Sequence, residues 1–570
     1  MTTLLRSPLT RKTYLKATFL AALWINAATL LATTERPNVL FILTDNQSYE
    51  ELSCRGHTEV QTPNIDRFAA DAIDFTNFHA PPFCSPSRAA ILTGRYSMRA
   101  GIHNTIGGVS ILHKDEVTIA DRLKKAGYKT AVFGKWHLGL SHPYHPKQRG
   151  FDKAFIHGGG GIGQLEDYYG NAHLHPVFED DGVFVHSEGF STDVLFAEAT
   201  QFIREQNGDP FFCFISTPAT HRPWQAHPQA AERIKARGKT YPPNELALYS
   251  MIENIDDNVG SILRFLADSN LEDNTLVILA TDQGTRRERQ HKDLAYDEYH
   301  QVFCFARYPP LTRGQERASN LLTGVVDLTP TIMDLCGLPP DPSLDGRSLR
   351  ACLQGEDRWH DDRTLIVQCP RGRVRQAWVN VSVKTQDYRL LNGNQLFHSQ
   401  SDPSQTRNIA ASHREVVQRL RQRYQSFWNS LPASWECLSR HELGAYEAPS
   451  TKLNAMDWYR DAAPWHQLHM PDFKGNGVWA VDVIRAGEYR FELRHYPREA
   501  PQALEAEKAV LRMGDHQARI ELSPDDDCAV FTLRLSPGDY DLRTAFSPTP
   551  SNPRGDEWGA LFVYVDYLGP

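Results

Sequence analysis

The sequence lacks any excess of positive charge. Its 570 residues include 61 Lys and Arg against 69 Asp and Glu, which gives a formal net charge of −8. Because nucleic-acid-binding proteins carry clustered basic residues, this balance excludes nucleic acid as the main partner. It still allows a small anionic substrate, since a basic pocket can lie within an acidic surface.

Internal repeats and low-complexity tracts are also absent, and their absence excludes repeat architectures and long disordered regions. Hydrophobic residues make up 41% of the chain and aromatic residues 10%, as in ordinary globular proteins. The length exceeds what one hydrophobic core supports, so we expect more than one domain.

Long apolar runs are scarce. The longest, residues 17–31, follows a basic stretch with Arg6, Arg11, Lys12 and Lys16. It is shorter than the roughly 18 residues that span a bilayer, and its position is typical of a signal peptide. We therefore expect a signal peptide over residues 1–34, export to the periplasm or the medium, and no stable membrane span. A retained N-terminal anchor is the alternative.

Cysteines are few and widely spaced. There are nine, an odd number, so at least one stays outside any internal disulfide. Export would permit disulfides, but the spacing shows no small disulfide scaffold, and we predict no connectivity.

Short apolar runs alternate with helical patterns from residue 36 onward. The predicted strands are Val39–Leu43, Thr130–Phe133, Phe211–Ile215 and Thr275–Ala280; the predicted helices are Ile65–Ala72, Thr118–Ala126, Asp193–Glu205 and Leu246–Ala267. This alternation predicts an α/β domain over residues 35–364, with a central, mostly parallel sheet flanked by helices.

The pattern changes after residue 364. Residues 365–431 predict a smaller α+β subdomain ending in a helix over His413–Trp428, and residues 432–449 resemble a linker. Residues 450–570 show only strand patterns separated by turn signals, among them Val478–Ile484 and Phe531–Leu535. They predict a β-sandwich-like accessory domain.

Polar side chains follow each of the four predicted strands. They are Asp45 and Asn46, Lys135 and His137, His221, and Asp282 and Gln283. Ligands of parallel sheets bind at the carboxyl ends of the strands, so we expect these side chains to lie together. The oxygen donors suit a hard cation such as calcium or magnesium, and the basic groups suit an oxyanion and proton transfer. Taken singly, each residue is more typical of a turn or cap, whereas polar residues at four strand ends together favour a site.

The sharpest local signal is Cys84-Ser-Pro-Ser-Arg88. Pro86 and Ser87 are good helix-opening residues, so Cys84 should lie just before a helix N-terminus. The backbone N–H groups there favour an anionic nucleophile or ligand.

This motif resembles the signature of the type I sulfatases, members of the alkaline-phosphatase-like superfamily. Further segments resemble that family in the same order: Leu92-Thr-Gly-Arg95, Arg36–Asp45 (RPNVLFILTD), Thr62–Arg67 (TPNIDR), Gly134–Gly139 (GKWHLG), Gln148–Asp152 (QRGFD) and Asp327–Thr331 (DLTPT). The resemblance covers roughly residues 36–430. It implies an enzyme that hydrolyses sulfate esters.

The resemblance also implies the cofactors and partners. Cys84 would be oxidised after translation to formylglycine by a formylglycine-generating or an anaerobic maturing enzyme, which would account for the odd cysteine. One calcium ion would be held by Asp45, Asn46, residue 84, Asp282 and Gln283. Family habit and export together favour a sulfated polysaccharide or oligosaccharide as substrate.

Catalytic roles follow from the same resemblance. One hydroxyl of the hydrated formylglycine would attack sulfur and expel the alcohol, while Arg88 orients the diol. Lys135, His221 and Lys292 would clamp the sulfate, with His221 or Lys292 as proton donor to the leaving oxygen. His137 would then deprotonate the second hydroxyl, so that sulfate leaves and the aldehyde returns.

Three of these positions have weaker support. Lys292 rests on the likeness of residues 292–298 to a family segment, and a solvated lysine is its alternative, because charged residues precede it. His103 and Asn104 follow the helix of the nucleophile, and we expect them to line the substrate pocket.

Two departures from the family concern the metal. The family has Asp-Asp at 45–46 and Asp-Asn or Asp-His at 282–283, whereas this chain has Asp-Asn and Asp-Gln. One negative charge is therefore missing at the metal, which weakens neutralisation of the metal's charge. Gln283 is one methylene longer than the family's asparagine, and it would either bind the metal or contact the sulfate.

Two other functions remain open. A phosphodiesterase or phosphonate monoester hydrolase of the same superfamily would use the same nucleophile. A non-catalytic carbohydrate-binding exoprotein would use the aromatic residues of the tail, although aromatic residues in a β-sandwich are usually core. These residues are Trp458, Trp465, Trp479, Tyr489, Tyr496 and Trp558.

The run His157–Gly163 (HGGGGIG) resembles a phosphate-binding loop only superficially. No strand pattern precedes it, no helix pattern follows it, and the lysine of such loops is absent. We therefore expect a flexible loop on the substrate side.

Overall fold

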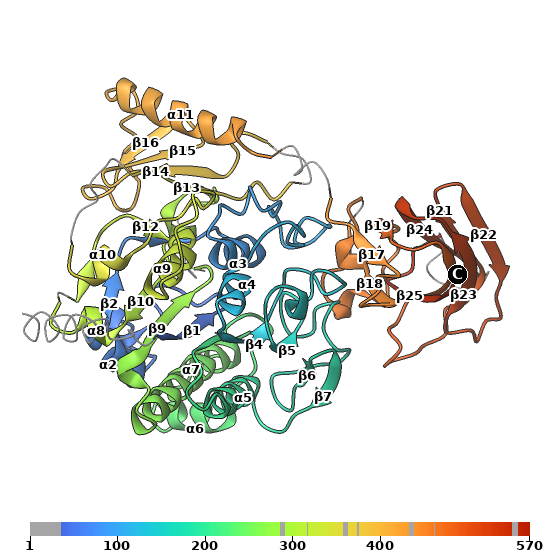
Figure 1. Ribbon diagram of the computed structural model, residues 1–570, viewed down its shortest axis with the longest axis horizontal. Helices are drawn as coiled ribbons and strands as arrows, with labels where there is room; N and C mark the ends of the chain where they lie inside the picture. The colour runs from blue at the N-terminus through green and yellow to red at the C-terminus, as the bar shows by residue number, and fades with distance from the viewer. Residues whose placement is uncertain are drawn as a thin grey trace, which may run out of the picture.

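The computed structural model describes residues 36–284, 291–315, 317–356, 363–372, 376–432, 438–460, 462–549 and 557–570. The expected signal peptide, residues 1–34, lies outside these residues. Figure 1 shows a large α/β part, a small sheet with one helix packed beside it, and a separate group of strands that ends at the C-terminus.

The α/β part is organised around a ten-stranded mixed sheet. In spatial order its strands are β11 (Ala318–Ser319), β2 (Ile73–Phe75), β10 (Cys304–Arg307), β9 (Thr275–Thr281), β1 (Asn38–Thr44), β8 (Phe211–Ser216), β4 (Lys129–Lys135), β5 (Lys153–His157), β6 (Val177–Asp180) and β7 (Val183–His186). The five central strands, from β9 to β5, run parallel. The predicted α/β fold with a mostly parallel centre is confirmed.

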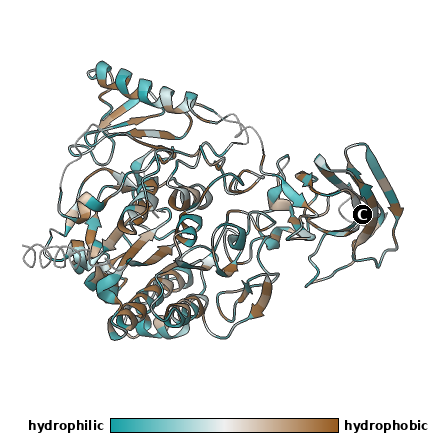
Figure 2. Cartoon of the chain, in the orientation of Figure 1, coloured by the Kyte–Doolittle hydropathy of each residue, from teal (hydrophilic) through white to brown (hydrophobic). Residues whose placement is uncertain are grey.

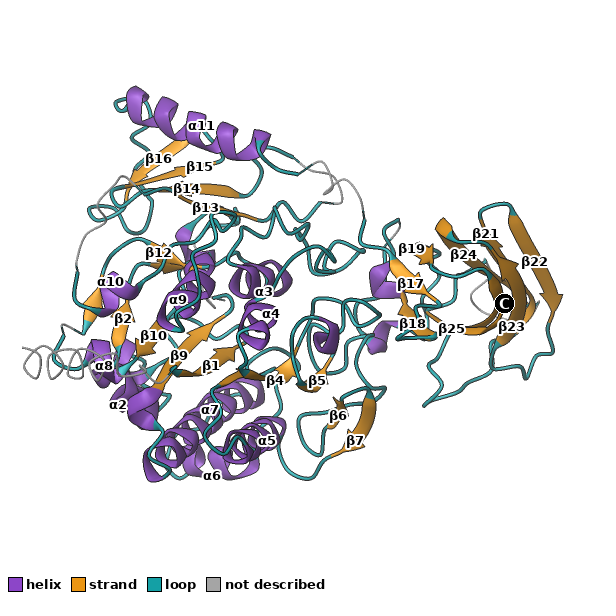
Figure 3. Ribbon diagram, viewed as in Figure 1, coloured by secondary structure: helices purple, strands orange, loops and turns teal. Residues whose placement is uncertain are grey.

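Helices cover both faces of this sheet (Figure 3). One face packs against α3 (Cys84–Thr93), α4 (Ile119–Lys125) and α9 (Leu328–Leu335), and the other against α2 (Pro63–Asp71), α5 (Ser191–Glu205) and α7 (Pro243–Asp268). The other described helices of this part are α6 (Pro228–Lys235), α8 (Pro309–Thr312) and α10 (Arg350–Leu353).

Strand β1 is apolar along its length because both of its faces are covered. Val39, Phe41 and Leu43 enter one core cluster, while Leu40 and Ile42 enter the other. Figure 2 shows the hydrophobic colour concentrated in these central strands. Buried parallel strands therefore explain the continuous apolar runs in the sequence.

The small sheet follows the α/β part in the chain. It is antiparallel, in the order β13 (Leu365–Gln368), β14 (Val381–Lys384), β15 (Tyr388–Leu391) and β16 (Gln395–His398), with β12 (Thr323–Gly324) and β3 (Phe78–His79) pairing separately. Helix α11 (Arg414–Asn429) packs on it through an apolar stripe that includes Leu420, Tyr424 and Phe427.

Residues 441–569, here called the β region, form two further sheets. One has the order β17 (His441–Leu443), β19 (Val478–Val483), β24 (Gly538–Pro548), β21 (Ala506–Met513) and β22 (His516–Glu521); the other has β18 (Ser450–Asn454), β25 (Phe562–Gly569), β20 (Gly487–Arg494) and β23 (Ala529–Leu535). Both sheets contribute to one core, which also takes in Leu165 of the α/β part.

Two local features differ from expectation. The segment 432–449, expected as a linker, contains β17, which pairs in parallel with β19. A strand, β5, also directly precedes the glycines of residues 158–163, where the sequence analysis found no strand pattern.

No described helix is long and apolar enough to cross a membrane. The eight cysteines within the described ranges are all free thiols, and Cys437 lies outside those ranges.

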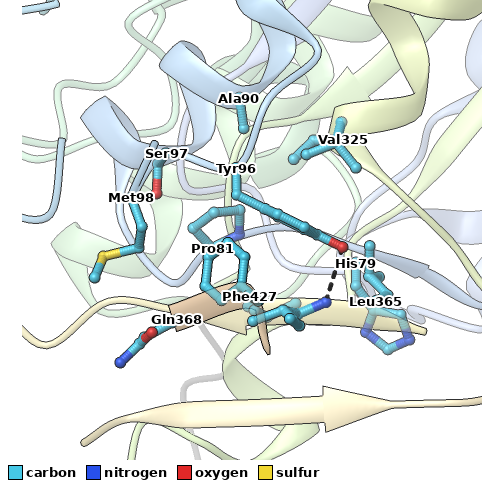
Figure 4. Close-up of a pocket in the computed structure, with 13 residues that line it drawn as sticks. His79, Pro81, Ala90, Tyr96, Ser97, Met98, Val325, Leu365, Gln368 and Phe427 are labelled. Carbon is cyan, nitrogen blue, oxygen red and sulfur yellow. Dashed lines mark hydrogen bonds between the residues drawn. The ribbon is translucent and has the colours of Figure 1, made fainter. Parts of the chain in front are cut away.

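The segment that follows helix α3 contacts the small sheet and its helix through Tyr96 (Figure 4). The Tyr96 hydroxyl, just after α3, accepts a hydrogen bond of 3.1 Å from the backbone N–H of Ile366 in β13. The Tyr96 ring also packs edge-on against Phe427 of α11, at 5.2 Å between ring centroids. The pocket that these residues line contains none of the predicted site residues.

Tyr96→Phe tests this connection. The substitution keeps the ring but leaves the Ile366 N–H without its acceptor, so the free energy of unfolding should fall by about 1–3 kcal/mol. Urea unfolding measures the change. An unchanged unfolding midpoint would contradict the role given to the hydroxyl.

Candidate functional site

Three potential metal ligands meet at the carboxyl edge of the central sheet. Asp45 follows β1, Asp282 follows β9, and Cys84 is the first residue of α3. All three are buried, and one ligand atom from each lies within 4.8 Å of those of the other two. Two of the residues that follow predicted strands, Asp45 and Asp282, therefore lie in one compact cluster with Cys84.

Strand register brings the two carboxylates together. Thr44 of β1 pairs with Thr281 of β9, so the next residue of each strand, Asp45 or Asp282, lies at the same edge. Asn46 then turns in the left-handed region, with φ of 62°, and its N–H donates to Asp282 Oδ1 at 3.2 Å. An asparagine tolerates this backbone conformation better than most residues.

Two buried cations neutralise the carboxylates. Arg88 donates to Asp282 Oδ2 from Nε at 3.1 Å and from Nη2 at 2.9 Å. Lys135 Nζ donates to Asp45 Oδ2 at 2.5 Å. All four side chains are at most 1% exposed, so each charge depends on its partner.

Ser216, which the sequence analysis did not select, links Arg88 to the backbone of Lys135 by hydrogen bonds. Its hydroxyl donates to the Lys135 carbonyl at 2.8 Å, and that carbonyl also accepts from Arg88 Nη1 at 3.0 Å. Arg88 Nη1 bonds the Ser216 hydroxyl as well. Ser216 could have been recognised from the sequence, because it directly follows the predicted strand Phe211–Ile215.

The oxygen donors fit a bound cation. Gln283 Nε2 donates to Asn46 Oδ1 and lies 3.5 Å from Cys84 Sγ. Two side-chain oxygens of the site, Asp45 Oδ1 and Gln283 Oε1, are buried with no hydrogen-bond partner among the described residues. Buried acceptors without donors, beside two carboxylates, form the oxygen-rich site that a hard cation prefers.

Burial governs the pKa values at this cluster. It raises the pKa of the Cys84 thiol to about 11, and the nearby Asp45 and Asp282 carboxylates add to the rise. Burial likewise raises the pKa of Asp282 to about 6, with Asp45 as the next cause. Both shifts disfavour negative charge, and a cation would oppose them.

His137 is poised as a base. Its Nε2 lies 3.0 Å from the Thr105 carbonyl and must donate to it, which leaves the lone pair on Nδ1. Nδ1 is buried and has no partner among the described residues. Burial, then the charges of Lys135 and Arg88, hold the His137 pKa well below its usual value, so the ring is neutral.

His221 is also neutral in this arrangement. Its Nδ1 donates to the Arg222 carbonyl at 2.6 Å, so the lone pair is on Nε2. Burial lowers its pKa to about 3, and the charge of Lys135 adds to the effect.

The glycine loop, residues 158–163, lies against both histidines. A Cβ on Gly160 would lie 2.5 Å from His137 Cε1, and a Cβ on Gly161 would lie 2.5 Å from His221 Nδ1. Only glycine fits this closely, so the loop is on the side of the site, as expected.

His157, which starts this run, is a further site residue that the sequence analysis did not select. It pairs with Lys135 across β4 and β5 and is buried. Neither of its ring nitrogens has a partner among the described residues, and burial holds its pKa well below the usual value. Recognition of β5 would have identified it as another residue at a strand end.

The remaining predicted residues are less central. Lys292 is exposed, follows residues outside the described ranges, and makes no hydrogen bond or ion pair to the described residues. His103 is buried, and Asn104 Nδ2 donates to the carbonyl of Arg371 at 3.0 Å. The Arg371 guanidinium lies 4.5 Å from the ring centroid of Phe83, next to Cys84, and no sequence motif indicated it.

Comparisons with known proteins point to one family. The profile of the family described as "Sulfatase" matches residues 37–338. Human N-acetylgalactosamine-6-sulfatase is 31% identical over 360 residues, covering 56% of this chain and 66% of that protein. The N-acetylglucosamine-6-O-sulfatase of Bacteroides thetaiotaomicron is 24% identical over 510 residues, covering 70% of this chain and 88% of its own.

The fold also matches a solved structure. The crystal structure of Ps i-CgsB in complex with k-i-k-neocarrahexaose superimposes with a TM-score of 0.62 at 23% identity, covering 71% of this chain and 95% of that chain.

The pKa of Cys84 gives a first prediction. With a value near 11, almost no thiolate is present at pH 7, and thiolate should rise about tenfold per pH unit below the pKa. Alkylation of the unmodified thiol by iodoacetamide should therefore be slow at pH 7 and accelerate with pH. Asp282→Asn should accelerate it at fixed pH, because a carboxylate that raises the pKa is lost. Mass spectrometry of the peptide measures both, and a rate independent of pH would contradict the assignment.

Proposed function

The chain belongs to the sulfatase family of sulfuric ester hydrolases, and from that premise we propose that it removes sulfate from polysaccharides or oligosaccharides. The observation that carries the proposal is the buried cluster of Asp45, Cys84 and Asp282 with its two cations, Lys135 and Arg88. The two relatives are named as sulfatases of 6-sulfated amino sugars, which supports a sulfated carbohydrate as substrate.

Two groups would complete the site. Residue 84 would be oxidised to formylglycine by a formylglycine-generating or an anaerobic maturing enzyme. The hydrate of that formylglycine would supply the oxygen nucleophile that displaces the alcohol from sulfur. One calcium ion held by Asp45, Asn46, Asp282, Gln283 and residue 84 would supply positive charge beside the nucleophile and the sulfate. The all-oxygen side-chain donors suit a hard cation such as calcium, and the replacement of one family carboxylate by Asn46 predicts weaker binding.

The remaining residues would bind the sulfate and move protons. Lys135 and Arg88 carry fixed positive charge into a water-poor site, where it stabilises the charge that develops on the transferring group. His137, neutral and with its lone pair on Nδ1, would accept the proton of the nucleophile's second hydroxyl, so that sulfate leaves.

The proton donor to the leaving oxygen is His221 or Lys292. With a pKa of about 3, the His221 ring is neutral at pH 7 and carries no proton on Nε2, so it would have to gain a second proton with the anionic substrate. Lys292 would have to approach from its exposed position. His103 and Asn104 would line the pocket next to the Thr105 carbonyl that holds His137.

Two further elements belong to the proposal. Residues 1–34 would direct export to the periplasm or the medium. The superfamily alternative, a phosphodiesterase or phosphonate monoester hydrolase, would use the same cluster and is separated by substrate preference.

The central test follows the peptide that contains residue 84. After co-expression with a maturing enzyme, the peptide should carry an aldehyde instead of a thiol, and the protein should cleave 4-nitrophenyl sulfate faster than 4-nitrophenyl phosphate. Cys84→Ala should lower turnover by about 10⁴-fold or more, while Cys54→Ala, at an exposed cysteine, should not.

EGTA should remove activity, and calcium should restore it. Full activity with an intact thiol, or a preference for phosphate, would refute the proposal.

A second test identifies the proton donor. Loss of the donor should reduce hydrolysis of a sugar sulfate by about 10²–10⁴-fold but barely affect 4-nitrophenyl sulfate, whose leaving group needs no proton. His221→Ala and Lys292→Ala, compared on both substrates, therefore distinguish the two. The variant with the substrate-dependent loss marks the donor. Equal losses on both substrates would assign that residue to sulfate binding instead.

A further inference from the structure

We propose that the Trp465 loop, residues 463–469 of the β region, forms a sugar-binding subsite beside the sulfate site. The Trp465 indole would stack on the pyranose ring next to the sulfated unit. This inference rests on the proposed function and extends it, because it assigns to the β region a role in choosing the substrate.

The Trp465 loop makes backbone hydrogen bonds to the glycine loop and to the residues that directly follow it. Its His466 pairs with Gln164 in a β-bridge, and the backbone N–H of Gln467 donates to the Gly163 carbonyl at 3.1 Å. The N–H of Leu165 donates to the Trp465 carbonyl at 3.3 Å, and the Leu165 side chain enters the core of the β region.

The buried side chain of Gln467 fixes this junction. Its Nε2 donates to the Gln164 carbonyl at 2.9 Å and also reaches the carbonyls of Asp167 and Tyr168. Its Oε1 accepts from the Gly170 N–H at 2.9 Å. One amide thus satisfies the backbone of a loop about 300 residues away in the chain, so the two segments hold a fixed relative position.

The other part of the glycine loop contacts the catalytic histidines. Gly161 lies against His221, and Gly163 lies against His466, whose ring atoms are 3.3 Å from the position of a Gly163 Cβ. Two residues of extended chain span at most about 7 Å. The Trp465 loop is therefore within reach of a sugar unit attached to one bound at His221.

Trp465 differs from the other tryptophans of the β region. Trp458, Trp479 and Trp558 are fully buried, whereas Trp465 is 47% exposed. Its ring is steadied by edge-on contacts with His466 and His469, at centroid distances of 5.4 and 5.3 Å. The core explanation that accounts for the three buried tryptophans therefore does not apply to Trp465.

This combination suits a pyranose ring. An exposed indole offers a flat apolar surface that can cover the C–H face of a sugar, while the two imidazoles beside it can hydrogen-bond hydroxyl groups. A protein partner would need about 800 Å² of surface, far more than one indole provides. The arrangement thus favours a neighbouring sugar of the same substrate.

The experiment compares long and short substrates. Tetrasaccharides from chondroitin 6-sulfate and from keratan sulfate are assayed beside N-acetylgalactosamine 6-sulfate and N-acetylglucosamine 6-sulfate, all normalised to 4-nitrophenyl sulfate. For the better tetrasaccharide, the mature wild type should show kcat/KM at least tenfold above its monosaccharide, mainly through KM.

Trp465→Ala should remove that advantage, and Trp465→Phe, which keeps an aromatic face, should retain most of it. Leu468→Ala is the matched control, because Leu468 is 81% exposed in the same loop and makes no ring contact. A wild type without a tetrasaccharide advantage, or a Trp465→Ala variant that keeps it, would overturn the inference. Failure of the wild type to cleave 4-nitrophenyl sulfate would refute the proposed function itself, and the subsite with it.

Discussion

The site depends on charge neutralisation in a region from which water is excluded. Asp45 and Asp282 are forced together by the register of β1 and β9, and such a pair is stable in the interior only beside opposite charge. Lys135 from β4 and Arg88 from α3 supply it. Four separate elements must therefore meet for any one of these charges to be tolerated, which ties the fold of the α/β part to the chemistry of the site.

The two cations do not fully neutralise the site, and the oxygens left unpaired indicate where a further positive charge would bind. Two buried oxygens of the site have no donor among the described residues, and the raised pKa values of Cys84 and Asp282 favour their uncharged forms. The histidines show the complementary response, because burial, reinforced by the surrounding cations, lowers their pKa values and keeps them neutral. An oxygen-rich cluster beside neutral bases and fixed cations is an environment suited to a metal ion and an anionic substrate together.

The β region is connected to this site through the glycine loop. Glycines allow the loop to approach His137 and His221 closely, and the segment that follows is held by Gln467 and anchored by Leu165. A second contact supports the same arrangement, because the N–H of Gly107 donates to the Met456 carbonyl at 2.6 Å, near the Thr105 carbonyl that orients His137. The β region is therefore structurally part of the site's surroundings.

The sequence by itself predicted the fold class, the four central strands β1, β4, β8 and β9, and the polar residues that follow them, because apolar runs and the polar residues after them are local patterns. The motif at Cys84 likewise identified the first residue of α3. Only the tertiary structure decided the roles of Ser216, His157, the glycine loop and Trp465. Those residues depend on contacts between segments up to about 300 positions apart, and one sequence carries no record of which distant segments will pack together.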